Sequence, residues 1–324
     1  HKEVWLSMKL SANWIWKQSG DYNRYNETVI IRKTFSLPAF SAGRIAITAD
    51  SYYRLFVNGR WVNDGPCRSW PNHYQYDELD ISGCLQPGEN EVRVVARFFG
   101  VGSFHQVPKE AGLLAQIEVI PVRSVAGHVS TKAAKAAEER DAALRGFSDI
   151  GAKPAPLKRT DGGAVITFVT DATWEAAAAP AWVSNTPKAS IQMEGLEAYD
   201  ARLDGEARYE KAVVRYGAGD GPWKGLAPRD VALLTRKPFS FTRFVEANVV
   251  DASWLSHTFP LGRLCHPGLI EANYNTSMAS VVCTILRAER EAVVGIASDT
   301  MIMSVNGTLV KDRKATLRSG DNFL

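Results

Sequence analysis

Apolar and polar residues alternate along much of this chain of 324 residues. Within residues 90–98, Val92, Val94 and Ala96 fall on one face of an extended chain, and Arg93 falls on the other. Alternation at a period of two is typical of half-buried antiparallel strands. Such segments follow one another at short spacing with Gly, Pro and Asn between them. The pattern predicts an all-β fold of the sandwich type and argues against βαβ units.

Two parts of the chain share a hairpin pattern. Residues 50–62 read DSYYRLFVNGRWV, and residues 299–310 read DTMIMSVNGTLV. Asn-Gly between alternating strands is the strongest short-range signal for a hairpin. Residues 85–92 and 317–324, which follow the two copies, both read Leu-x-x-Gly-x-Asn-x-apolar. The shared order predicts a duplicated sandwich whose second copy stops as a strand begins, so we expect this chain to be the N-terminal part of a longer polypeptide.

The repeat suggests three regions. We expect a first β-sandwich over residues 1–125, a connecting region with further strands over 126–240, and a second, incomplete sandwich over 241–324. Residues 131–145 (TKAAKAAEERDAALR) are rich in good helix formers and precede a glycine, which predicts a short helical insertion on the surface.

Composition excludes several classes of partner. The chain has 38 basic and 35 acidic residues, so it carries no polybasic footprint for nucleic acid. No apolar run reaches the ~20 residues that a membrane helix needs. We therefore expect neither nucleic acid nor a membrane as partner. Cys67, Cys84, Cys265 and Cys283 lack zinc-site spacing and could be free thiols, which we favour, or two disulfides. The start of the chain shows no secretory apolar segment, and the compartment stays open.

One loop after the first hairpin gathers side chains that suit a sugar. Arg68, Trp70, His73 and Tyr74 lie close together in sequence. Sugars bind by stacking on aromatic faces while polar side chains hold their hydroxyl groups. The alternative is that Tyr74 is a strand residue and Trp70 caps the sandwich.

A second loop, residues 99–106, carries His105, which either faces a substrate or is a structural histidine. A third loop, residues 263–273, combines His266 with Glu271 and Asn273. Its spacing matches no known metal site, and a loop at a domain junction is the alternative.

Several carboxylates could in principle serve in glycoside hydrolysis, which needs two at a defined separation. The candidates are Asp77, Glu78, Asp80, Glu194, Glu197 and Asp200. The sequence places no two of them at such a separation. No nucleophile elbow, HExxH motif, P-loop or dinucleotide fingerprint occurs.

Motifs spread along most of the chain carry a family resemblance. They include residues 12–16 (ANWIW), 31–35 (IRKTF), 49–59 (ADSYYRLFVNG), 104–106 (FHQ), 112–116 (GLLAQ), 170–174 (TDATW) and 197–202 (EAYDAR). In these motifs the chain resembles bacterial α-L-rhamnosidase-like enzymes of glycoside hydrolase family 78. The helical segment at 131–145 departs from the family's usually shorter linker.

The resemblance implies tandem galactose-binding-like jelly-roll sandwiches that precede an (α/α)₆ barrel. That barrel, expected beyond residue 324, would carry the catalytic carboxylates of an inverting hydrolase acting on α-L-rhamnosides, so no catalytic residue is assigned in this chain. The implied partners are a rhamnose-containing glycan and the remaining domains of the same polypeptide. No cofactor is expected; calcium is conceivable, but no residue pattern assigns it. The alternative is a stand-alone, lectin-like module without hydrolase activity.

Overall fold

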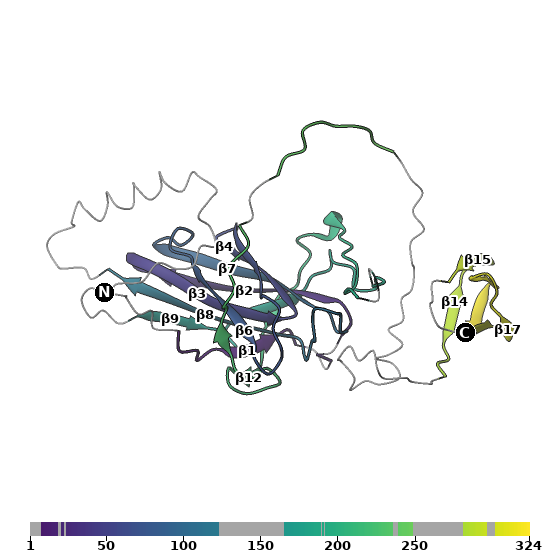
Figure 1. Cartoon of the computed structure of the whole chain (residues 1–324), viewed down its shortest axis with the longest axis horizontal. Coiled ribbons are helices and arrows are strands. Elements are labelled where there is room, and N and C mark those ends of the chain that lie inside the picture. Colours follow the sequence, from purple (N-terminus) through teal and green to yellow (C-terminus); the bar gives the residue numbers. More distant parts are fainter. Residues whose placement is uncertain are drawn as a thin grey trace. The chain divides into compact units, whose positions relative to one another are not determined.

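In the computed structural model, the chain forms two compact units (Figure 1). The described residues are 8–18, 21–22, 24–122, 165–188, 190, 192–235, 239–248, 281–296 and 302–324. The expected helix at 131–145, the loop at 263–273 and the beginning of the second hairpin motif lie outside them. Within these ranges, no helix is long and apolar enough to cross a membrane.

The first unit contains a seven-stranded sheet with the order β12-β1-β8-β3-β6-β13, and β9 also pairs with β8. Its strands are β1 (Asn13–Trp16), β3 (Phe40–Asp50), β6 (Gln75–Asp80), β8 (Gly112–Pro121), β9 (Ile166–Val169), β12 (Val213–Gly217) and β13 (Ala227–Pro228). Among the described strands, β6 and β13 form the one parallel pair.

A six-stranded antiparallel sheet with the order β11-β10-β2-β7-β4-β5 completes this unit. Its strands are β2 (Glu27–Leu37), β4 (Tyr52–Val57), β5 (Arg60–Gly65), β7 (Gly88–Phe98), β10 (Glu175–Ala178) and β11 (Glu210–Lys211). A single 3₁₀ turn, η1 (Ala201–Leu203), lies between β10 and β11.

Both sheets contribute side chains to one hydrophobic core. Val92 and Val94 of β7 are fully buried there, together with Ile117 and Val119 of β8. Arg93, which lies between the two valines, faces away from this core and is half-buried. The alternation in the sequence therefore corresponds to an inner and an outer face of each strand, and the expected all-β class is confirmed.

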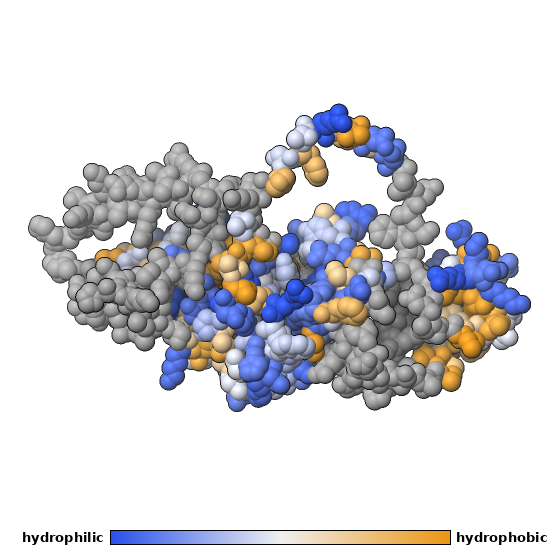
Figure 2. Space-filling view, in the orientation of Figure 1, coloured by the Kyte–Doolittle hydropathy of each residue, from blue (hydrophilic) through white to orange (hydrophobic). Residues whose placement is uncertain are grey.

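The second unit is smaller and is built from three strand pairs, β14–β19, β15–β18 and β16–β17. Its strands are β14 (Ile285–Ala288), β15 (Ala292–Gly295), β16 (Ser304–Val305), β17 (Thr308–Leu309), β18 (Lys314–Leu317) and β19 (Gly320–Phe323). Its core is formed by Val305, Ala315 and Leu317, whereas Val293 and Phe323 are exposed. Figure 2 shows hydrophobic surface on this unit next to hydrophilic residues.

The strand pairs of the second unit repeat pairs of the first in the same chain order. The pair β14–β19 of the second unit corresponds to β2–β7 of the first. In the same way, β15–β18 corresponds to β3–β6, and β16–β17 corresponds to β4–β5. The two Asn-Gly motifs lie at the turns of the hairpins β4–β5 and β16–β17. Both hairpins expected from the sequence are therefore present.

The two hairpin turns are held by the same hydrogen bonds. Asn58 and Asn306 have φ values of 50° and 51°, in the left-handed region that Asn tolerates. Each donates from Nδ2 to the Oδ1 of the downstream Asn, Asn90 at 2.9 Å and Asn322 at 2.8 Å. Each also accepts a bond from the backbone N–H that follows that Asn, at 2.8 and 2.9 Å. The repeated sequence pattern thus forms the same side-chain clamp in both units.

Candidate functional site

Trp70 lies on the loop between β5 and β6 and is 71% exposed, an unusual position for so large an apolar side chain. A tight turn presents it, because the N–H of His73 donates to the carbonyl of Trp70 at 2.9 Å. Arg68 and His73 are exposed on the same loop. The sequence thus identified three neighbouring residues that the structure leaves accessible.

A second segment supports this loop from behind. The N–H of Lys224 donates to the carbonyl of Pro71 at 2.6 Å, and the N–H of Tyr74 donates to the carbonyl of Lys224 at 2.9 Å. Gly225 has a φ of +59°, and a Cβ there would lie 2.8 Å from the carbonyl oxygen of Asn72. Only glycine suits this close approach, so the loop rests on a fixed backbone support.

Tyr74, the fourth candidate of this loop, is 1% exposed and lies in the interior. Its hydroxyl donates to the carbonyl of Ala49 at 3.1 Å, and its ring packs at a steep angle against Trp14 at a centroid distance of 6.0 Å. The structure therefore places Tyr74 where it supports the loop, and we leave it out of the candidate contact residues.

Trp14 and Trp223 form the centre of this aromatic support. Their rings stack with centroids 3.8 Å apart and an interplanar angle of 21°. A Cβ on Gly112 would lie 2.9 Å from Trp223 and 3.0 Å from Trp14, so the stack requires glycine at that position. The indole N–H of Trp223 donates to Oδ2 of Asp50 at 3.0 Å.

Asp50, at the end of β3, is a fully buried carboxylate. Besides Trp223, it accepts bonds from the backbone N–H of Lys109 at 2.6 Å and from the hydroxyl of Ser51 at 2.8 Å. Burial raises the pKa of Asp50 to about 6, although these hydrogen bonds act in the opposite direction. Asp50 therefore ties β3, the loop before β8 and the segment at Trp223 together beneath the exposed loop.

His105 lies on the loop between β7 and β8, and its Nε2 is 3.0 Å from Oε2 of Glu194. Both side chains are about three-quarters buried. The side chain of Gln106, on the same loop, lies close enough to Tyr74 to oppose the rise in its pKa that burial causes. The structure therefore brings the two candidate loops to the same end of the first unit, with His105 occupied by a carboxylate.

The other carboxylates named from the sequence have structural partners as well. Glu197 pairs with Arg97 at 3.1 Å, and Asp200 pairs with Arg202 at 2.6 Å. Glu78 accepts from the backbone N–H of residue 8, and Asp80 accepts from that of residue 82. Each of these acids therefore has a structural partner.

Asp77 is the most enclosed of these acids. It accepts a short hydrogen bond from the hydroxyl of Tyr53, and its Oδ1 lies 2.6 Å from Nε of Arg229, whose side chain is also largely buried. Burial raises the pKa of Asp77, and Tyr53 and Arg229 oppose that rise. A Cβ on Gly65 would lie 2.2 Å from this carboxylate, so Gly65 leaves the space that the network fills.

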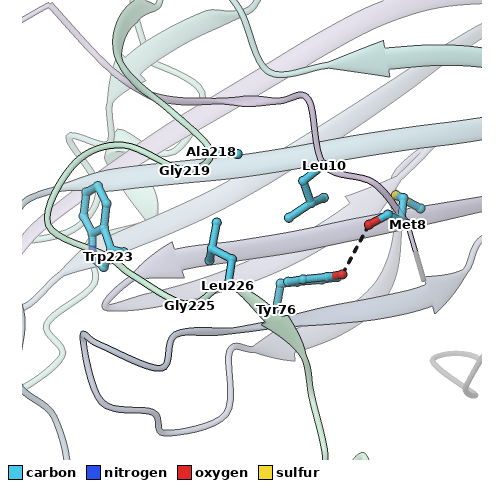
Figure 3. Close-up of a pocket in the computed structure, with 8 residues that line it drawn as sticks. All are labelled: Met8, Leu10, Tyr76, Ala218, Gly219, Trp223, Gly225 and Leu226. Atoms are coloured by element: carbon cyan, nitrogen blue, oxygen red, sulfur yellow. Dashed lines mark hydrogen bonds between the residues drawn. The ribbon is translucent and has the colours of Figure 1, made fainter.

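A cavity of about 280 Å³ lies on the seven-stranded sheet (Figure 3). It is lined by Met8, Leu10, Tyr76, Ala218, Gly219, Trp223, Gly225 and Leu226. No charged side chain lines it, and the Tyr76 hydroxyl already donates to the carbonyl of Met8 at 3.5 Å. Such a lining offers neither an acid nor a base for chemistry.

Metal ligands and disulfides are also absent from the described ranges. No group of three or more His, Cys, Asp or Glu side chains there could hold a metal ion. Cys67, Cys84 and Cys283 are free thiols, and Cys265 lies outside those ranges.

Comparison with solved structures gives a match that spans almost the whole chain. The GH78 family rhamnosidase of Bacillus sp. GL1 matches with a TM-score of 0.61 and 26% sequence identity over 98% of this chain. The chain is structurally similar to the N-terminal part of family 78 α-L-rhamnosidases. It spans 31% of the length of the Bacillus rhamnosidase. The family resemblance expected from the sequence is thereby confirmed as a structural similarity.

Two weaker matches have TM-scores too low to support an argument. The α-L-rhamnosidase of Streptomyces avermitilis, complexed with L-rhamnose, matches at 19% identity and a TM-score of 0.39, over 68% of this chain and 16% of its own. A lectin from Pleurotus ostreatus, in complex with GalNAc, matches at 21% identity and 0.36, over 66% of this chain and 44% of its own. No family model matches the chain, and no curated protein matches it significantly.

Sequence reasoning missed the residues that hold the two candidate loops in place. Asp50 appeared only within the repeat and the motif at residues 49–59, and Trp223 was not singled out as a candidate. An acid at the end of an alternating strand is ordinary in a turn, so nothing local marked Asp50 as buried. Its partners lie 59 and 173 residues away in sequence.

Proposed function

We propose that this chain is the non-catalytic N-terminal β-sandwich region of a glycoside hydrolase that acts on α-L-rhamnosides. The observation that carries the proposal is the match over 98% of the chain to the Bacillus rhamnosidase. Catalysis would reside in an (α/α)₆ barrel elsewhere in the whole protein, and the remaining domains would be this region's partners. The local pairing of the candidate carboxylates is consistent with that division of roles.

We also propose that both units belong to galactose-binding-like jelly-roll sandwiches arranged in tandem. The support is the pair of equivalent Asn clamps, at Asn58 and Asn306, together with three strand pairs that recur in the same chain order. The downstream turn repeats as well, because Asn90 and Asn322 each accept from the backbone N–H four residues earlier and donate to the carbonyls four and two residues earlier. These matches are more than a shared hairpin turn would give.

The exposed loop would be the contact with sugar. Trp70 offers an indole face on which the C–H groups of a pyranose can stack, and Arg68 and His73 are close enough in the chain to donate to its hydroxyl groups. His105 would contribute as a neighbouring polar group, because Gln106, the next residue, lies close to Tyr74. The backbone support at Gly225 holds the platform in place before the ligand arrives, which lowers the entropic cost of binding.

Replacing Trp70 with Ala tests this role. Calorimetric titration with a rhamnose-containing oligosaccharide should show binding to the wild-type chain and a loss of at least about tenfold in Trp70→Ala, as expected when a stacking aromatic is removed. Phe241→Ala is the matched control, because Phe241 is fully exposed elsewhere in the chain and should leave affinity unchanged. Equal affinities of Trp70→Ala and wild type would refute the contact.

A further inference from the structure

The outer face of the six-stranded sheet carries a row of charged and aromatic side chains that the core does not explain. The row crosses β11, β10, β2, β7 and β4 in that order, with one residue on each strand. Each residue is directly opposite the next one in the row: Lys211, Glu175, Arg32, Arg93 and Phe56. Residues directly opposite in antiparallel strands share a face, so the row crosses the sheet in a straight line. Figure 1 shows β2, β7 and β4 side by side at its centre.

Two arginines are neighbours in this row. Arg32 and Arg93 form a cross-strand pair, an arrangement that is destabilising for like charges. Glu175 pairs with Arg32 at 3.0 Å and with Lys211 at 3.7 Å, so one carboxylate serves two cations. Arg93 forms no ion pair with any described residue; Glu91, on the same face two residues away, lies beyond pairing distance. The row therefore has an excess of positive charge centred on Arg93.

Aromatic rings hold both guanidinium groups flat. Arg32 stacks on the ring of Tyr209 with 3.7 Å between its Cζ and the ring centroid, and Arg93 stacks on Phe56 at 4.7 Å. Stacking of this kind engages the faces of a guanidinium and leaves its N–H edges as donors. Those edges match the two oxygens of a carboxylate, which arginine binds in bidentate fashion.

A further aromatic ring lies within electrostatic range of Arg93. Tyr199 is 48% exposed, Asp204 raises the pKa of its hydroxyl, and the positive charge of Arg93 acts in the opposite direction. That charge also acts on Tyr209, so Arg93 lies within electrostatic range of both tyrosines. Trp182 packs against the ring of Tyr199 with centroids 5.0 Å apart and thereby fixes its orientation. The group consists of an unpaired arginine, a neighbouring arginine and a half-exposed, oriented ring.

We propose that this face, defined by Arg32, Arg93, Tyr199 and Tyr209, binds a carboxylated sugar residue. The carboxylate lies against the N–H edges of Arg93 and Arg32, where it relieves their mutual repulsion, and the sugar ring stacks on Tyr199. The choice of a sugar as the carrier of the carboxylate rests on the proposed function. The site shares no residue with the loop that bears Trp70.

The test is binding of tetragalacturonate, a chain of carboxylated sugars, measured by calorimetry on the whole 324-residue chain. Its methyl-esterified form keeps the sugar rings and removes the charge, and tetraglutamate keeps the charge and removes the rings. We expect the free acid to bind at least about tenfold more tightly than either, because a charge-assisted bidentate pair and a stacked ring both contribute. Equal binding of the ester or of tetraglutamate would overturn the proposal.

Variants assign the binding to this face. Arg93→Gln should weaken tetragalacturonate binding by at least about tenfold, and Tyr199→Ala should weaken it severalfold. Arg287→Gln makes the same charge change at an exposed arginine of the second unit and should have no effect. Arg93→Gln should leave binding of the rhamnose-containing oligosaccharide unchanged. The test of this carboxylate site can therefore fail independently of the test of the proposed sugar contact at Trp70. An unchanged affinity in Arg93→Gln, with an unchanged melting temperature, would also overturn the proposal.

Discussion

Replacing Trp223 with Ala is expected to destabilise the first unit by about 3–5 kcal/mol, as large-to-small changes at buried aromatic side chains do. The substitution removes the stack on Trp14 and leaves a cavity next to the one in Figure 3. It also leaves the buried carboxylate of Asp50 without its indole donor. The quantity to measure is the free energy of unfolding of the first unit, from denaturant titration.

Two further variants separate these contributions. Trp223→Phe keeps an aromatic ring in the stack but loses the indole N–H, so its cost should be only about 1–3 kcal/mol, the range for a buried hydrogen bond with one partner removed. Trp70→Ala, at an exposed tryptophan, should change stability by less than about 0.5 kcal/mol. A loss below about 1 kcal/mol in Trp223→Ala would show that the aromatic stack does not support this part of the fold.

The stability of the first unit should depend on pH through Asp50. Burial raises the pKa of Asp50 from 3.8 to about 6 in the folded chain, so the folded state binds this proton more tightly than the unfolded state does. The group therefore favours folding most when it is protonated, below about pH 4. Its contribution falls as the pH rises from about 4 to about 6 and is then constant. A shift of about two units corresponds to a loss of about 3 kcal/mol.

Asp50→Asn isolates this effect because the amide does not titrate. The free energies of unfolding of wild type and Asp50→Asn should be measured at intervals between pH 4 and pH 7, and their difference plotted against pH. Other titrating groups cancel in that difference. We expect the advantage of wild type to shrink by about 3 kcal/mol across the interval. A difference that is constant with pH would mean that Asp50 keeps an ordinary pKa in the folded chain.

Strand patterns and turns could be predicted because their signals are local. The period of two around Val92 and Val94 gave the inner face of β7, and Asn-Gly at 58–59 and 306–307 gave two hairpins. The side-chain clamp could not be derived in the same way. The partner of Asn58 is 32 residues away, whereas that of Asn306 is 16 residues away, so no fixed spacing announces the bond.

The candidate site was predictable in part. A cluster of Arg68, Trp70 and His73 in a loop suggests exposed polar and aromatic groups, and the structure leaves all three accessible. Tyr74 follows one residue after His73, yet it is buried, because its ring packs against Trp14 and Trp223 just before β6 begins. The pairing of Arg32 with Arg93 depends on the register between β2 and β7, which sequence alternation alone does not fix.

The most direct test of the proposed role is the hydrolysis of an aryl α-L-rhamnoside by the purified chain. It should be run at high enzyme concentration beside a complete family 78 rhamnosidase as positive control. We predict no turnover by the 324-residue chain, because its candidate carboxylates are held in structural pairs and the resemblance assigns catalysis to a separate barrel. Turnover that is retained after repeated purification and abolished by substitution of an acid within this chain would contradict the account.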